Sequence, residues 1–175
     1  MIQMKKIQIL FFALIAIVAS SCVKNDPVLV TDTTDPVLEW DASTYNSKAA
    51  GVNYPILTRV PGFSRAVSTT VDPLITRTVG TIKFRINVVG APTSNPRTVT
   101  YQAATTGTTA VAGTHYTMTG TATVAANTTY ADVEVQILNP GASATARDLI
   151  LQINGGDGLR ANPNYNLLGI RIAQN

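Results

Sequence analysis

The chain has 175 residues, and its 13 Lys and Arg against 10 Asp and Glu give a formal net charge of +3. The cations are scattered singly along the chain, whereas nucleic-acid-binding proteins cluster them to neutralise phosphates, so we expect no nucleic-acid partner. The single cysteine, Cys22, excludes an intrachain disulfide. Charged residues are sparse at 13%, and the 25 threonines favour an extracytoplasmic β-rich domain.

The first 21 residues have the three zones of a secretory signal peptide. Lys5 and Lys6 form a positive start, Ile9 to Ala19 is an apolar run, and Ala19-Ser20-Ser21 is a small-residue exit. A membrane-spanning helix needs roughly 20 apolar residues, and this run is much shorter. We therefore predict that residues 1–21 form a helical signal peptide that is cleaved.

The residues before Cys22 indicate a lipid anchor. Ala19-Ser20-Ser21-Cys22 resembles the lipobox of bacterial lipoproteins, in which the cysteine becomes the lipid-bearing first residue of the mature protein. A diacylglyceryl group together with an N-linked acyl chain such as palmitate makes a stable anchor, whereas one chain does not. We predict that Cys22 is lipidated and that it tethers the protein to the bacterial outer membrane.

Residues 22–35 are predicted to be a flexible, acidic tether between the lipid and the folded domain. Lys24-Asn25-Asp26 resembles in part the charged export signal of surface lipoproteins of the Bacteroidota, which favours the cell surface over the periplasmic face. Asp32-Thr33-Thr34 matches the short pattern that these bacteria O-glycosylate, so Thr33 is a candidate modification site.

Residues 36–175 are predicted to form one domain, in which apolar and polar residues alternate with the period of two that is typical of β-strands. The alternation is clearest from residue 80 to 173. Between 41 and 79 it is weaker, because Pro55 and Pro61 favour an edge strand or an extended loop. Turns recur about every ten residues, which predicts an antiparallel, immunoglobulin-like β-sandwich of about seven to nine strands. The expected strands are 37–40, 74–79, 80–89, 99–103, 120–124, 131–138, 147–153 and 168–172.

Between Gly80 and Ala173 the strand Val99–Gln102 is followed by Thr109–Tyr116, and later by Gly120–Val124 and Tyr130–Leu138. The first two segments resemble the signature of the Calx-beta family, a strand followed by an Ala-x-Ala-Gly-x-Asp-Tyr run, and the last two resemble the next two strands of that module. The resemblance implies a Calx-beta-like sandwich of the kind found in uncharacterised surface lipoproteins. Many members bind calcium through clustered acids. Here residues 139–145 contain no acid and His115 replaces the Asp, so we expect no metal site and no cofactor.

The residues offer little for catalysis. His115 is the single histidine, and as a general base it would need a nucleophile and an orienting carboxylate nearby. Asp132 and Glu134 alternate onto the solvent face of their strand, so we expect His115 to bond locally in a loop beside a buried Tyr116. Residues 154–158 are expected to form a turn between the last two strands. We predict that the protein is not an enzyme.

Two classes of function remain. The first is a non-catalytic binding or adhesion module with a protein or glycan partner, for example an accessory to surface glycan uptake or attachment. The second is a structural subunit that packs against other outer-membrane or surface proteins. Four aromatic residues could form a sugar-stacking platform if they were exposed together, or complete the core if they were buried separately. The sequence leaves both alternatives open for Trp40, Tyr54, Phe63 and Tyr165.

Overall fold

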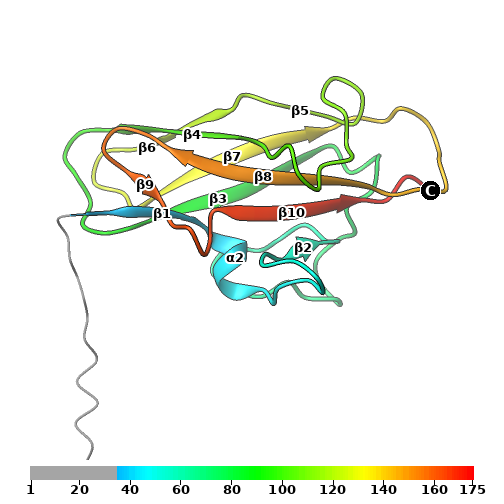
Figure 1. Cartoon of the computed structure of the whole chain (residues 1–175), viewed down its shortest axis with the longest axis horizontal. Coiled ribbons are helices and arrows are strands. Elements are labelled where there is room, and N and C mark those ends of the chain that lie inside the picture. The colour runs from blue at the N-terminus through cyan, green and yellow to red at the C-terminus, as the bar shows by residue number, and fades with distance from the viewer. Residues whose placement is uncertain (1–34) are drawn as a thin grey trace, which may run out of the picture. The chain divides into compact units, whose positions relative to one another are not determined.

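The computed structural model describes residues 35–175 (Figure 1). The predicted signal peptide, Cys22 and Thr33 lie outside the described residues. No helix between residues 35 and 175 has the length and apolar content to cross a bilayer.

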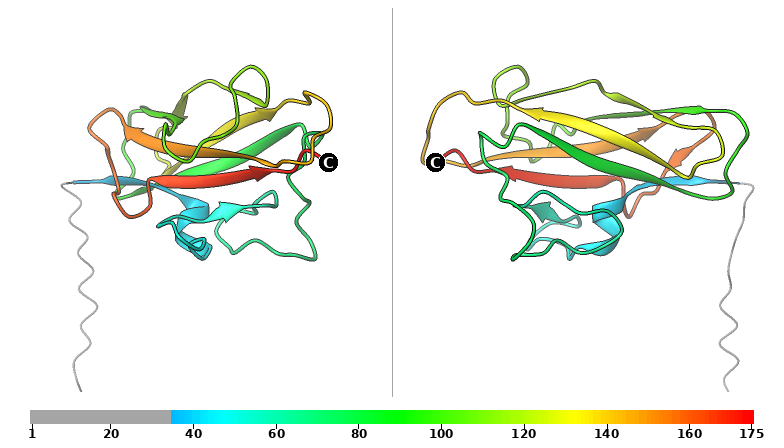
Figure 2. Two further views of the ribbon diagram at one scale, coloured as in Figure 1. Left: turned by 45° about the vertical axis from the view of Figure 1, so that its right-hand side comes forward. Right: turned by 180° about the vertical axis from the view of Figure 1, so that it is seen from behind.

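The domain consists of two five-stranded sheets that face each other (Figure 2). Sheet A has the order β5-β7-β3-β1-β9, and its strands are β1 (Val37–Trp40), β3 (Thr81–Val89), β5 (Tyr116–Met118), β7 (Tyr130–Ile137) and β9 (Arg160–Ala161). Sheet B has the order β2-β10-β8-β4-β6, and its strands are β2 (Ile56–Leu57), β4 (Arg97–Ala103), β6 (Thr121–Val124), β8 (Arg147–Gly155) and β10 (Leu167–Ile172). The one helix in residues 35–175 is α2 (Asp41–Tyr45). The all-β prediction is confirmed, and eight of the strands have three or more residues.

The core forms where the alternating apolar faces of the two sheets meet. In β3 the predicted inward residues are all at most 5% exposed, and the inward residues of β7 and β8 are buried in the same way. Trp40 is fully buried and meets Tyr101 of sheet B edge-to-face, with ring centroids 6.0 Å apart. Its indole N–H donates to the carbonyl of Asn166 at 3.0 Å, so the polar atom of the ring is satisfied. Burial of these apolar faces contributes roughly 25 cal/mol per Å².

The connectivity is that of an immunoglobulin-like sandwich. β1, β3 and β7 correspond to strands A, B and E, and β4, β8 and β10 correspond to C, F and G. β6 pairs with β4, beside strand C, through Arg97↔Val124 to Thr100↔Thr121, and β5 pairs with β7, beside strand E, where constant-type domains have strand D. The predicted immunoglobulin-like sandwich is therefore confirmed.

Residues 41–79 run along the free edge of β10 (Figures 1 and 2). β2 pairs in parallel with β10 at Ile56 and Leu57, so of the two alternatives, an edge strand or an extended loop, these two residues form the edge strand. The prediction of a strand at residues 74–79 is wrong. Leu74 bridges back to Arg59 while Thr76 bridges to Ala173, so its backbone pairing is divided between two partners. α2, β5 and β9 were not predicted, because segments of two to five residues are too short to show a period.

The 41–79 segment is also fastened to sheet A. The Asp41 carboxylate, 2% exposed, accepts hydrogen bonds from the Ser64 N–H at 2.6 Å and from the Asn87 amide of β3 at 2.7 Å. Beside it, the Arg85 guanidinium lies between the rings of Phe63 and Tyr130, 4.0 and 3.8 Å from their centroids. The segment is therefore held by both sheets and closes one side of the sandwich.

An ion pair folds this segment upon itself. The Asp72 side chain, 7% exposed, accepts two hydrogen bonds from Arg65 at 2.5 and 2.8 Å and one from the Ser68 N–H at 2.7 Å. The hydrogen bonds from Arg65, and after them that from Ser68, favour the carboxylate and lower the pKa of Asp72 to about 2. Arg59 donates to the Asp72 backbone carbonyl at 2.6 Å, so the turn around Asp72 is tied at three points.

Candidate functional site

A groove of about 340 Å³ lies on the outer face of sheet B. Its floor is formed by β8 and the start of β10, and its two walls are residues 53–54 and the segment that follows β4. The floor contains Ile150, which points away from the core yet is only 1% exposed because both walls cover it. The nine lining residues are Asn53, Tyr54, Ala104, Thr105, Thr106, Ile150, Gln152, Asn166 and Leu167.

The wall that follows β4 is fixed to β8 by hydrogen bonds. The Ala104 N–H donates to the Ile150 carbonyl at 2.7 Å, and the Thr108 hydroxyl accepts from the Ile150 N–H at 3.1 Å. Thr109 donates its N–H to the Asp148 carbonyl at 2.7 Å, while its hydroxyl accepts the Asp148 N–H at 2.9 Å. A loop with this many backbone bonds is held in place before any ligand arrives.

The wall of residues 53–54 depends on a glycine in β10. The Gly169 N–H donates to the Pro55 carbonyl at 2.9 Å, and a Cβ at Gly169 would lie 2.8 Å from the Ile56 side chain. Only glycine lets the chain approach β10 this closely. Across the groove, a Cβ at Gly107, whose φ is +84°, would lie 3.1 Å from the Tyr54 hydroxyl. The two walls therefore meet at Tyr54 and Gly107.

The groove is polar and uncharged. Six of its lining residues have polar side chains, and within residues 35–175 none of the six makes a side-chain hydrogen bond or is sealed from solvent. No carboxylate, imidazole or ammonium group lines the groove. Such a surface can form hydrogen bonds to a ligand, but it lacks the usual groups for proton transfer. The six are Asn53, Tyr54, Thr105, Thr106, Gln152 and Asn166.

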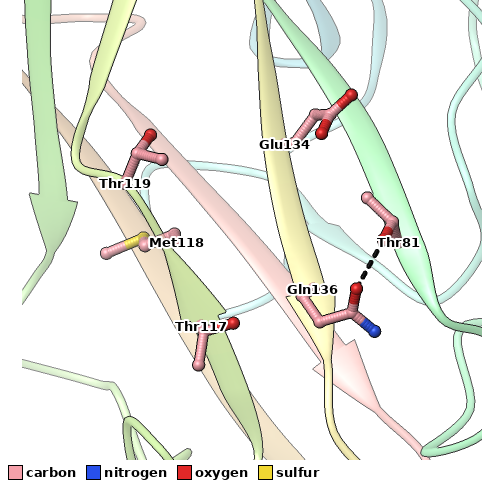
Figure 3. A pocket seen from close by; sticks show the side chains of 6 residues that line it. All are labelled: Thr81, Thr117, Met118, Thr119, Glu134 and Gln136. Atoms are coloured by element: carbon pink, nitrogen blue, oxygen red, sulfur yellow. Dashed lines mark hydrogen bonds between the residues drawn. The ribbon is translucent and has the colours of Figure 1, made fainter.

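A second depression lies on the outer face of sheet A, and most of its polar side chains are bonded within the protein (Figure 3). Figure 3 shows its side chains spread along β5, β7 and the start of β3, where the Thr81 hydroxyl donates to Gln136 at 2.6 Å. Glu134 pairs with Lys83 at 3.1 Å, and the Thr119 hydroxyl donates to a backbone carbonyl at 2.9 Å. Most of its polar groups are already bonded within the protein, so the groove on sheet B is the better candidate.

The four aromatic residues singled out from the sequence do not form one platform. Trp40 is in the core, and Phe63 stacks on Arg85 against sheet A. Tyr54 lines the groove on sheet B. Tyr165 is half-buried, and its backbone carbonyl accepts a hydrogen bond from the backbone N–H of Trp40 at 3.0 Å. Of the two alternatives, a shared stacking platform or separate burial in the core, Trp40 follows the second. Tyr54 is the aromatic residue that a ligand in the groove could contact.

The other candidate residues have local roles. His115 is 9% exposed, and its Nδ1 accepts the Val111 N–H at 3.0 Å beside Tyr116, whose burial raises the pKa of its phenol; this confirms the predicted loop histidine. Asp132 and Glu134 lie on the solvent face as predicted and pair with cations of β3. Among residues 35–175, no three His, Cys, Asp or Glu side chains are grouped so as to hold a metal ion.

The expected turn at 154–158 needs a correction. β8 continues to Gly155, Gly156 bridges to Leu159, and the turn at Asp157–Gly158 leads into β9 rather than directly into the last strand. Gly156 is required where it stands, because a Cβ there would collide with the Thr98 carbonyl. Gly156 therefore serves close packing against β4, which the local sequence did not indicate.

No family model matches the chain, and no curated protein resembles it at a significant level. Three solved structures have a similar course of the chain. The apo-form CBD1 domain of Calx is 11% identical, covers 79% of this chain and 97% of that chain, and has a TM-score of 0.49. A protein of unknown function from Bacteroides ovatus is 13% identical with coverages of 79% and 52% and a TM-score of 0.49, and CBD12 from CALX1.2 is 14% identical with coverages of 57% and 40% and a TM-score of 0.47. The chain thus spans about half of the second structure and 40% of the third. Likeness of this degree carries no inference about ligands or activity.

Proposed function

We propose that this protein is a membrane-anchored extracytoplasmic lipoprotein that acts as a non-catalytic binding or adhesion module, in a setting such as surface glycan uptake or attachment. Lipid on Cys22 would hold it at the outer membrane, with the surface-exposed face favoured. The groove on sheet B would be its binding site.

The observation that supports this function most directly is the state of the groove's polar side chains. Buried or half-buried amides and hydroxyls are normally bonded within the protein. Here the half-buried side chains of Tyr54, Gln152 and Asn166 have no hydrogen bond within residues 35–175, and they lie beside three exposed polar residues between walls that are fixed in advance. A few convergent polar groups on an apolar, preformed surface are typical of small-ligand sites, and preformed walls reduce the entropy lost on binding.

The sheet edges favour this function over a structural subunit that joins partners by strand addition. Strand addition needs a long exposed edge. β2 and Thr76 cover β10, and β9 covers part of β1. The outer strands on the opposite side, β5 and β6, have three and four residues, and the part of β7 that β5 leaves uncovered is the five residues Tyr130 to Glu134. Such short edges are poor templates for a partner strand.

The anchor is tested by cell fractionation with detergent-phase partitioning of the full-length protein and its Cys22→Ala form. Wild-type protein should enter the membrane and detergent phases, and the variant should remain in the aqueous phase. If both partition alike, the lipid anchor is refuted. Protease treatment of intact cells then distinguishes the surface from the periplasmic face.

The binding role is tested by a thermal-shift screen of the mature protein against oligosaccharides, peptides and small metabolites. A ligand at 100 times its Kd stabilises the folded state by roughly 2.7 kcal/mol, which such a screen detects. A genuine hit should lose its shift in Gln152→Ala, in the groove, and keep it in Gln136→Ala, the same substitution on sheet A. If no compound of any class gives a shift that depends on Gln152, the groove is not a binding site.

A further inference from the structure

We infer that the groove on sheet B binds an uncharged saccharide, held by the side-chain amides and hydroxyls of four separate segments; this inference rests on the proposed function and specifies its ligand class. Sugar hydroxyls both donate and accept hydrogen bonds. The amides of Asn53, Gln152 and Asn166 can each do the same, and so can the hydroxyls of Thr105 and Thr106. The groove therefore matches the hydrogen-bonding character of a polyhydroxylated ligand.

The lack of charge in the groove selects against acidic and phosphorylated ligands. Carboxylates and phosphates are bound through charge-assisted hydrogen bonds, most often from Arg. None of the nine lining residues is charged, so an anion entering the groove would lose hydration without gaining a cation. The same reasoning excludes cationic ligands, because no carboxylate lines the groove to receive them.

The position of the groove on the sheet selects against a peptide in extended conformation. Such peptides bind by adding a strand to a free sheet edge. At this groove the edge of β10 is already occupied, since Gly169 and Ile170 pair with Ile56 and Leu57 and the Gly169 N–H is bonded to Pro55. What remains accessible is the side-chain face of the sheet, which offers amides rather than backbone groups.

The apolar part of the floor completes the match. Ile150 and Leu167 lie beside the amide of Gln152, and in the register of the sheet Gln152 is directly opposite Leu167. A pyranose ring presents C–H groups on its faces and hydroxyls at its rim, so it can contact the half-buried Leu167 and the Tyr54 ring while its rim reaches the amides. At about 340 Å³ the groove is near the lower end of ligand sites, so it accommodates a chain end or a short stretch of a glycan.

The experiment measures binding of the mature lipidated protein, reconstituted in vesicles, to two sets of immobilised polysaccharides. The neutral set contains α-glucan, β-glucan, mannan and galactan, and the acidic set contains polygalacturonate and hyaluronate. Display on vesicles makes the interaction multivalent, which raises retention when single-site affinity is weak. Wild type is compared with Gln152→Ala and Asn53→Ala, from the floor and one wall, and with the control Gln136→Ala. Isothermal titration with an oligosaccharide from the best polysaccharide then gives the Kd.

We expect at least one neutral polysaccharide to retain the vesicles, and each groove substitution to raise the Kd about three- to tenfold, as the loss of one or two ligand hydrogen bonds should. Gln136→Ala should bind as wild type does. Circular dichroism of each variant shows whether it is folded, so lost binding is not confused with lost structure.

Three results would overturn the inference. Retention restricted to the acidic set, or hits restricted to peptides in the thermal-shift screen, would refute an uncharged saccharide as the ligand. If that binding were lost in Gln152→Ala, the groove would still be the binding site and the proposed function would stand. Retention by a neutral polysaccharide that neither groove substitution weakens would place the sugar elsewhere. No retention together with no thermal shift that depends on Gln152 would refute both the inference and the proposed function.

Discussion

The buried carboxylate of Asp41 should contribute more to stability than any exposed acid of the domain. It accepts one hydrogen bond from the backbone of Ser64 and one from the Asn87 side chain, at 2.6 and 2.7 Å, and it is 2% exposed. Hydrogen bonds to a charged group contribute roughly 1.5–3 kcal/mol each, and both of these bonds are partly buried. We expect Asp41→Ala to lower the free energy of unfolding by about 3 kcal/mol.

The matched control is Asp148→Ala. Asp148 pairs with Arg171 at 2.8 Å, with the Arg side chain 49% and the Asp side chain 22% exposed, and ion pairs open to solvent contribute about 0–1 kcal/mol. For a domain of this size 3 kcal/mol corresponds to a fall in Tm of about 10 °C. Trp40 is the single tryptophan and is fully buried, so its fluorescence in a urea titration reports unfolding directly. If Asp41→Ala loses no more stability than Asp148→Ala, the role given to the buried carboxylate is refuted.

Two further predictions concern the same segment. Because the pKa of Asp72 is lowered to about 2, its ion pair with Arg65 stabilises the folded state above about pH 4, and this stabilisation is lost as the pH falls through 2. Asp72→Asn should therefore flatten this part of the curve of unfolding free energy against pH, measured by urea titration. A slope equal to that of wild type would contradict the role of this ion pair. Phe63→Ala should lower the free energy of unfolding by about 1–2 kcal/mol, because it removes one of the two rings that enclose Arg85, whereas Phe63→Tyr keeps the ring and should stay within about 0.5 kcal/mol of wild type in thermal melts.

The strands of the sandwich could be predicted because alternation is a local property of the chain. In β3 and β7 each inward residue is followed by an outward one, and the burial of the two strands follows the same order. Burial of one face forces this pattern on any half-buried strand, so the sequence shows it without knowledge of the partner strand. The same reasoning placed Asp132 and Glu134 on the solvent face, where they are found.

The course of residues 41–79 could not be predicted in the same way. Its backbone alternates between partners, with Ile56 paired to β10, Leu74 to Arg59 and Thr76 to Ala173, and no period survives such changes. Its attachment to sheet A depends on Asp41 and Phe63, which meet Asn87 and Arg85 only after the chain has folded. Neither an isolated Asp nor an isolated Phe in a loop indicates such a contact.

The groove on sheet B could not be predicted from the sequence either. Asn53, Gln152 and Asn166 carry no motif, and amides of this kind are common in turns and on the outer faces of strands. They come together because Gly169 allows residues 53–55 to lie against β10, and because Thr108 and Thr109 fasten the opposite wall to β8. By itself the sequence determined the β-sandwich, which follows from local patterns, and the anchor at Cys22 stays a prediction of the same kind. Only the tertiary structure decided that these side chains form a groove, because the groove depends on contacts between segments far apart in the chain.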